Sequence, residues 1–127
     1  VLAGALGGHL DHVVGHLALL RRAVRRGVPA RLASPELCVT ALIGPSAADL
    51  DAGPGTRVSL VPLEGDASVS LEGVAYPLDR GLLPADACLG LGNAVAGRAR
   101  VTVHAGAVAV FVHDGEETFG RRGRRSP

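Results

Sequence analysis

The spacing of apolar residues changes near residue 45, and this change divides the chain into two parts. Before it, Leu10, Val13, Leu17, Leu20 and Val24 recur every three or four residues, which predicts one amphipathic helix. After it, apolar residues alternate within the short segments RVSLVPL, ASVSLEGVAY, RARVTVHA and AVAVFVH, which is typical of β-strands. The sequence therefore predicts an α+β, mostly β chain.

The first part has the pattern of a parallel α/β domain. The apolar run VLAGAL predicts a buried strand that ends at Gly7-Gly8, and the helix follows it. Gly27 and Pro29 are expected to end that helix. Residues 30–33 and 37–43 predict two more strands. We expect residues 1–45 to be the C-terminal remnant of an α/β domain.

The second part has the pattern of a β-sandwich. Residues 46–55 are expected to be a linker, because the surrounding stretch GPSAADLDAGPG carries three glycines and two prolines. The short β segments with frequent turns predict a sandwich over residues 56–113. The last two segments flank Ala105-Gly106 and are expected to pair as a hairpin. Pro62 and Pro77 are expected at strand ends or bulges.

Charge and cysteine content exclude several functions. The net charge is +1, all thirteen basic residues are arginine, and four of them lie in residues 114–127, an expected flexible tail. Without interleaved aromatic residues, this pattern argues against nucleic-acid binding. No apolar run is long enough to span a membrane. Cys38 and Cys88 are fifty residues apart without CxxC spacing, which supports neither a zinc site nor a disulfide framework, so two reduced thiols in a cytoplasmic protein are expected.

The stretch GALGGHLDHVVGH, residues 4–16, is the richest in chemical groups. On a helix His9, His12 and His16 share one face, a spacing compatible with a metal site but also with ordinary polar histidines. A strand, a Gly-Gly turn and a helix N-terminus also suit an anion such as phosphate. The stretch matches neither GxGxxG nor GxxxxGK[ST], so both interpretations stay open.

In a longer comparison, GALGGHLDHVVGHLALL resembles the GALGGRLDHxLANLxLL segment of thiamine pyrophosphokinases. Downstream, GTRVSLVPL is similar to the family strand GxxVSLxPL, and SLEGVAYPL is similar to GxxxxGLxYPL. LGLGNAV stands where the family has an LGxSNE turn, and closing β segments follow. The resemblance covers about residues 1–112 in unbroken order, which makes it more specific than any single motif.

The resemblance implies a function. Thiamine pyrophosphokinases use Mg2+ to transfer the terminal diphosphate of ATP to thiamine, which gives thiamine diphosphate and AMP. They have an α/β domain and a thiamine-binding β-sandwich, and form homodimers whose active sites lie between the α/β domain of one subunit and the sandwich of the other. The resemblance assigns Asp11 and His12 to catalysis. It assigns Gly7, Gly8 and His9 to the ATP phosphates, and Gly92 and Asn93 to thiamine.

No metal ligand is assigned, because the family's Mg2+-binding aspartates belong to the first half of the α/β domain, which this sequence lacks. The resemblance therefore implies a partial chain that is inactive alone. Two of these residues also have ordinary structural interpretations: Asp11 as a first-turn helix residue and Asn93 as a turn residue.

Several positions depart from the family pattern. His9 replaces an arginine, His16 an asparagine, Gly92 the serine of the Ser-Asn pair, and Ala94 a glutamate. These exchanges remove phosphate and hydroxyl partners from the expected site. The alternative prediction is therefore a non-catalytic module that keeps the fold and the dimer contact of the family.

Overall fold

The computed structural model describes residues 2–3, 10–87 and 89–113. Within these residues the chain forms one helix and nine strands, in the order β1 (Leu2–Ala3), α1 (Leu10–Arg25), β2 (Arg31–Ser34), β3 (Leu37–Ile43), β4 (Ser46–Asp49), β5 (Arg57–Pro62), β6 (Ala67–Val74), β7 (Leu78–Leu83), β8 (Asn93–Ala105) and β9 (Ala107–His113). No helix in this part of the chain has the length and apolar character needed to cross a membrane.

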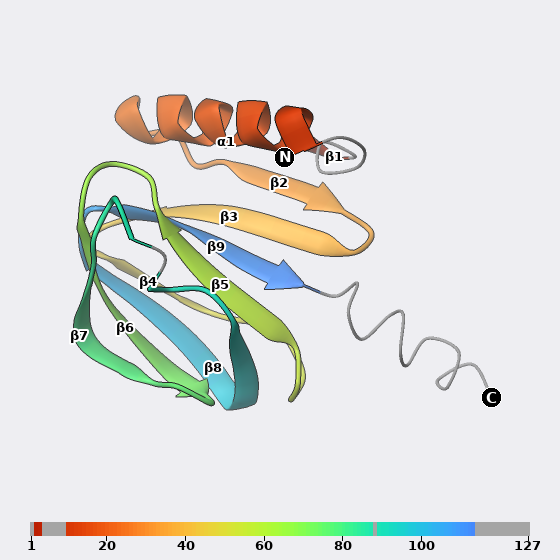
Figure 1. Cartoon of the computed structure of the whole chain (residues 1–127), viewed down its shortest axis with the longest axis vertical. Helices are drawn as coiled ribbons and strands as arrows, with labels where there is room; N and C mark the ends of the chain where they lie inside the picture. Colours follow the sequence, from red (N-terminus) through yellow and green to blue (C-terminus); the bar gives the residue numbers. More distant parts are fainter. Residues whose placement is uncertain (1, 4–9, 88, 114–127) are drawn as a thin grey trace.

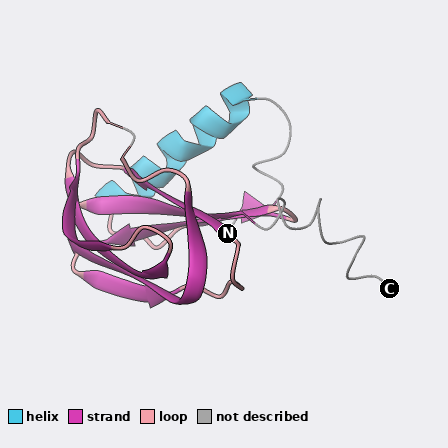
Figure 2. Ribbon diagram, turned by 60° about the horizontal axis from the view of Figure 1, so that its bottom comes forward, coloured by secondary structure: helices cyan, strands magenta, loops and turns pink. Residues whose placement is uncertain are grey.

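The strands pair into one sheet that folds over into two layers (Figures 1 and 2). Neighbours follow the order β1-β2-β3-β9-β5-β8-β6-β7, and β4 pairs with β8. The first layer holds β1, β2, β3, β9 and β5, and the second holds β4, β6, β7 and most of β8. The start of β8 pairs with β5 and the rest with β4 and β6, so β8 joins the layers. The predicted mostly β fold with a β-sandwich is confirmed.

Strand β9 lies between β3 and β5 in the first layer, and its first four residues are buried on both faces. Ala107 and Ala109 face α1, whereas Val108 and Val110 face the second layer. We call the apolar cluster under α1 the helix core and the cluster between the layers the sandwich core. The helix core contains Leu20, Val24, Leu32, Val39, Ala41, Leu63, Ala107 and Ala109. Small alanines on one face let the helix approach closely, while valines fill the sandwich.

The helix α1 lies against the first layer, on the face opposite the second layer (Figure 2). Leu20 and Val24 of the predicted apolar stripe are buried. Gly27, at φ +67°, donates its N–H to the Val24 carbonyl, and Val28 donates to the Ala23 carbonyl. These two bonds satisfy the last carbonyls of the helix in a Schellman motif, so the predicted helix end at Gly27 is confirmed.

Arginines on α1 connect the helix to the turn after β5. Arg21 Nε donates to the Leu63 carbonyl oxygen at 3.0 Å, and Arg25 Nε forms an ion pair with Glu64 Oε1 at 2.8 Å. The first layer also confirms the two strands predicted before residue 45, with β2 shifted by one residue from its expected bounds. Residues 1 and 4–9 lie outside the described part of the chain.

Two features of the second part differ from the sequence predictions. The expected linker contains β4, which pairs with β8 from Ser46↔Val103 to Asp49↔Arg100. The glycines and prolines of GPSAADLDAGPG lie on either side of β4. The composition of the whole stretch therefore indicated a linker although its middle forms a strand. β7 was not predicted as a strand either, because LDRGLL does not alternate regularly. The expected strand end at Pro62 is confirmed, because it is the last residue of β5, whereas Pro77 lies outside the strands and directly precedes β7.

The predicted hairpin between the last two β segments is wrong. β8 pairs with β4, β5 and β6, whereas β9 pairs with β3 and β5. Gly106, at φ +84°, is a corner where the chain passes from the second layer to the first. A Cβ at Gly106 would lie 2.7 Å from the Asp66 carbonyl oxygen, and Gly44 N–H donates to the Gly106 carbonyl oxygen. The glycine marks a crossing between layers and not a two-residue turn.

Candidate functional site

The LGLGN segment predicted as a binding turn forms a loop that runs beside β5. Leu60 N–H donates to the Gly90 carbonyl oxygen at 2.8 Å, and Gly92 N–H donates to Ser59 Oγ at 3.2 Å. A Cβ at Gly90 would lie 2.4 Å from the Leu60 carbonyl oxygen, so the close approach requires glycine. Gly92 has φ +79°, a conformation that glycine adopts without strain. We call residues 89–93 the site loop; its backbone is fixed by β5.

Asn93 ties the site loop to the turn after β6. Its Nδ2 donates to the Tyr76 carbonyl oxygen at 2.8 Å, and its Oδ1 accepts the N–H groups of Tyr76 and Ala94, each at 3.0 Å. The side chain is 8% exposed, and the carbonyl oxygen of its amide has both lone pairs engaged. Asn93 therefore positions Tyr76 and keeps one N–H for further bonding.

Three large apolar side chains are exposed around this fixed backbone. Tyr76 is 72% exposed, Leu89 66% and Leu91 52%. Exposed apolar side chains that stand together on a fixed backbone mark contact surfaces for ligands or partners. Leu89 and Leu91 were not predicted as site residues, although two leucines in a glycine-rich loop are themselves a signal of exposed apolar surface.

Two cavities flank Leu91. One, of about 200 Å³, is mainly apolar, and its lining includes Leu60, Tyr76, Pro77, Leu89, Leu91 and Asn93. The other, of about 380 Å³, is lined by Arg57, Ser59, Val61, Leu91, Gly92, Phe111 and His113. In the second cavity the rings of Phe111 and His113 stack with centroids 6.3 Å apart. The site loop therefore offers an apolar hollow on one side and a hollow with basic and hydroxyl groups on the other.

The N-terminal site residues are only partly covered by the structure. Gly7, Gly8 and His9 lie outside the described residues. The backbones of Asp11 and His12 lie in the first turn of α1, and their side chains are not described. Their expected roles stay predictions. Among the described residues, the buried Nδ1 of His16 has no hydrogen-bond partner.

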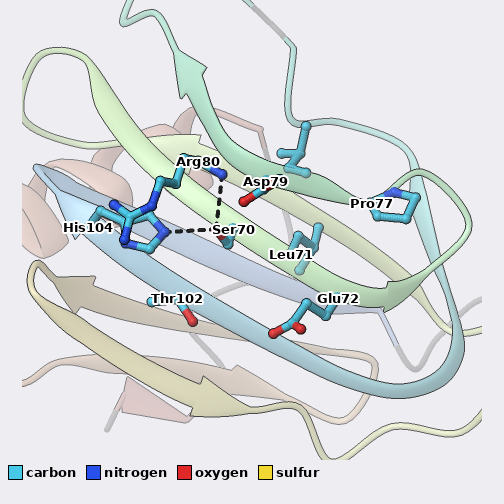
Figure 3. Close-up of a pocket in the computed structure, with 9 residues that line it drawn as sticks. Ser70, Leu71, Glu72, Pro77, Asp79, Arg80, Thr102 and His104 are labelled. Atoms are coloured by element: carbon cyan, nitrogen blue, oxygen red, sulfur yellow. Dashed lines mark hydrogen bonds between the residues drawn. The ribbon is translucent and has the colours of Figure 1, made fainter.

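A third, larger cavity of about 580 Å³ lies over β6, β7 and β8 (Figure 3). There Ser70 Oγ lies 2.7 Å from His104 Nε2 and accepts the Arg80 N–H at 3.0 Å. Arg80 has φ +51°, and the pairing of β6 with β7 shifts register between Val69 and Leu71. This cavity shares Leu71, Pro77 and Leu78 with the small apolar hollow. The Ser70 hydrogen bonds thus fix β7 next to the turn that carries Tyr76.

The family model "Thiamin pyrophosphokinase, vitamin B1 binding domain" matches residues 48–108, a segment that includes the whole site loop and Tyr76. Comparison of the sequence with curated proteins gives no match.

Solved structures share the fold at low sequence identity. Thiamine pyrophosphokinase from Bacillus subtilis aligns with a TM-score of 0.74 and 22% identity, covering 87% of this chain and 53% of that protein. Thiamin pyrophosphokinase from Geobacillus thermodenitrificans aligns with a TM-score of 0.70 and 22% identity, covering 88% of this chain and 52% of that protein. Thiamin pyrophosphokinase from Candida albicans aligns with a TM-score of 0.71 and 14% identity, covering 88% of this chain and 43% of that protein.

This chain therefore spans about half the length of the bacterial proteins that it resembles. The family match and the shared fold agree on the same segment, and they agree with the motif order seen in the sequence. The β-sandwich of this chain therefore carries the vitamin B1 binding domain of thiamine pyrophosphokinases, and the chain shares the fold of the solved structures of that family.

Proposed function

We propose that this chain is the thiamine-binding part of a thiamine pyrophosphokinase, which transfers diphosphate from ATP to thiamine and releases AMP. The observation that carries the proposal is the site loop. It lies inside the segment that matches the vitamin B1 binding domain, and it exposes Leu89 and Leu91 to solvent on a fixed backbone, next to Tyr76, whose backbone Asn93 holds. A rigid apolar surface suits the flat rings of thiamine, because little conformational entropy is lost on binding.

The chain's own residues would bind and orient thiamine. Tyr76 and Leu91 would cover the rings, with the Tyr76 face favouring the cationic thiazolium. The remaining N–H of Asn93 can donate to a ring nitrogen. Asp11 and His12 are proposed to orient the thiamine hydroxyl, and Gly7, Gly8 and His9 to approach the phosphates. A homodimer that brings a second subunit to the site loop is part of the same proposal, as is a location in the cytoplasm.

ATP and Mg2+ are part of the proposed reaction. Within the described residues, no three His, Cys, Asp or Glu side chains converge to hold a metal ion, so we assign no Mg2+ ligand here. Mg2+ would neutralise the phosphate charge during the transfer. What this chain contributes to the proposal is thiamine binding and orientation.

The first experiment is thiamine-dependent AMP release by the protein that contains this chain, in the presence of ATP and Mg2+. We expect AMP only when thiamine is added. Leu91→Ala is expected to raise the KM for thiamine about three- to tenfold, because it removes apolar contact from the ligand. Leu82→Ala is the matched control: Leu82 is also exposed, but it lines neither cavity beside Leu91.

A direct binding test separates thiamine recognition from catalysis. Tyr76 is the single tyrosine and the chain has no tryptophan, so the tyrosine fluorescence of this chain reports on the surroundings of Tyr76, beside the site loop. Saturable quenching by thiamine without AMP release would favour the alternative, a non-catalytic binding module. A folded protein with neither response would contradict both functions.

A further inference from the structure

A separate cavity of about 390 Å³ opens between the two layers, away from the site loop. Its floor is apolar and comes from both layers: Leu42 of β3, Ala48 and Leu50 at β4, and Val110 and Val112 of β9. Among these residues, Leu42, Ala48, Leu50 and Val112 are partly buried at the edge of the sandwich core. The cavity thus exposes apolar core side chains within a hollow of ligand size.

One lip of this cavity is cationic. Arg31, at the start of β2, donates from Nε to Cys38 Sγ at 3.0 Å, and this bond to the thiol raises the pKa of the guanidinium. The terminal nitrogens of Arg31 make no hydrogen bond with the described residues, so they are free to form a bidentate contact with a carboxylate. Thr40, on the adjacent strand, adds a hydroxyl to the same lip.

The opposite lip is acidic. Asp49 and Asp51 lie at the end of β4, across the cavity from β2 and β3. Asp49 Oδ1 accepts from Arg100 at 2.7 Å, which offsets its charge. Asp51 has no ion pair or hydrogen bond among the described residues, so its carboxylate is available to a cationic group. The lining of the cavity therefore combines one guanidinium and one carboxylate, neither in an ion pair with a described residue, with an apolar floor.

We propose that this cavity binds an α-amino acid with an aliphatic side chain. The carboxylate would lie on the guanidinium of Arg31, the ammonium on Asp51, and the side chain on Leu42, Val110 and Val112. A ligand with a single charge would form an ion pair at one lip and be repelled by the like charge at the other. An aliphatic zwitterion satisfies both and covers the apolar floor. The site is independent of the proposed thiamine site, since none of the residues that line the two flanking cavities lines this one.

The probe is L-leucine, titrated into the protein and followed through the methyl NMR signals of Leu42, Val110 and Val112. We expect saturable shifts with a dissociation constant on the order of 1 mM, because a small ligand on an open site gains little per atom. Removing either charge, with 4-methylpentanoate or 3-methylbutylamine, is expected to weaken binding. The loss should be about two- to fivefold, since exposed ion pairs are weak.

Paired variants separate ligand contacts from structural effects. Asp51→Asn should weaken leucine about two- to fivefold and leave 4-methylpentanoate unchanged or tighter, whereas Arg31→Gln should weaken leucine and leave 3-methylbutylamine unchanged or tighter. Asp86→Asn, at an exposed position that does not line this cavity, should change neither ligand.

Three results would overturn the proposal. The first is the absence of saturable shifts with leucine. The second is equal weakening of leucine and 4-methylpentanoate by Asp51→Asn, which would mean that the aspartate only supports the fold. The third is equal or tighter binding of 4-methylpentanoate than of leucine, which would make the site one for apolar anions. Thiamine should not compete with leucine, so failure of this proposal and failure of the thiamine proposal are separate outcomes.

Discussion

Single residues decide how the site loop is held against β5. Gly90 lies so close to Leu60 that no side chain fits, and Asn93 uses its amide to hold the backbone of Tyr76. The resemblance of LGLGNAV to the family's LGxSNE turn predicted the loop itself. It did not predict the Asn93–Tyr76 contact, which joins residues 17 positions apart through the pairing of β6 with β8.

Gly90→Ala is expected to lower the free energy of unfolding by about 1 to 3 kcal/mol, because the added methyl group would overlap the Leu60 carbonyl oxygen. The control is Gly97→Ala in β8, where an added Cβ meets no described atom within 4 Å. That variant should be as stable as the parent or up to about 1 kcal/mol more stable. Urea denaturation measures both, and equal stability of the two variants would contradict the close contact.

Substitutions of Arg80 measure how much its positive φ destabilises the fold. A non-glycine residue at positive φ costs about 1 to 2 kcal/mol, and Arg80 has φ +51°. Arg80→Gly removes this strain and Arg80→Ala keeps it, while both keep the N–H that donates to Ser70. We expect the glycine variant to be about 1 kcal/mol more stable than the alanine variant in chemical denaturation. A more stable alanine variant would show that Arg80 is not strained.

For helices and strands, the sequence predicted those features that depend on residues close together in the chain. The three- and four-residue spacing located α1, and Gly27 located its end. Strand pairing was less predictable. Ala105-Gly106 has the composition of a hairpin turn, yet β8 is thirteen residues long and pairs with β4, β5 and β6, not with β9. Which strand pairs with which depends on contacts across the whole sheet, which no short segment specifies.

The helix offers a matched pair of adjacent leucines. Leu20 is 1% exposed in the helix core, and Leu19 is 47% exposed. Leu20→Ala is expected to destabilise the fold by about 2 to 5 kcal/mol, because it leaves a cavity under α1. Leu19→Ala should cost less than about 1 kcal/mol. Thermal unfolding followed by circular dichroism compares them, and similar losses for both would mean that α1 does not pack as described.

For the whole molecule, the sequence predicted two units joined by a linker, whereas the strands of both units belong to one sheet. The change of period near residue 45 is real, but it marks a change of layer. β3 pairs with β9 over all seven of its residues, from Leu37↔His113 to Ile43↔Ala107. The apolar residues of β9 predict a strand that is buried on both faces. They do not show that each face packs into a different core, so the sequence did not reveal that β9 joins the two parts of the chain.

The shared sheet predicts that the chain unfolds as one unit. Because β9 contributes to the helix core and to the sandwich core, loss of either core should expose the other. In a urea titration, the methyl NMR signals of Leu20 and Val69, one from each core, should disappear with the same midpoint. A lower midpoint for Leu20, with the sandwich signals intact, would show instead that residues before 45 form a separate unit.

The position of β9 also has a consequence for biosynthesis. The strand between β3 and β5 is made after both of them, and each core lacks one of its walls until it arrives. While the ribosome is still adding residues before 113, the nascent chain holds two open apolar surfaces at once. Neither core can therefore be completed before β9 has been synthesised, and until then the nascent chain is exposed to aggregation and to chaperones.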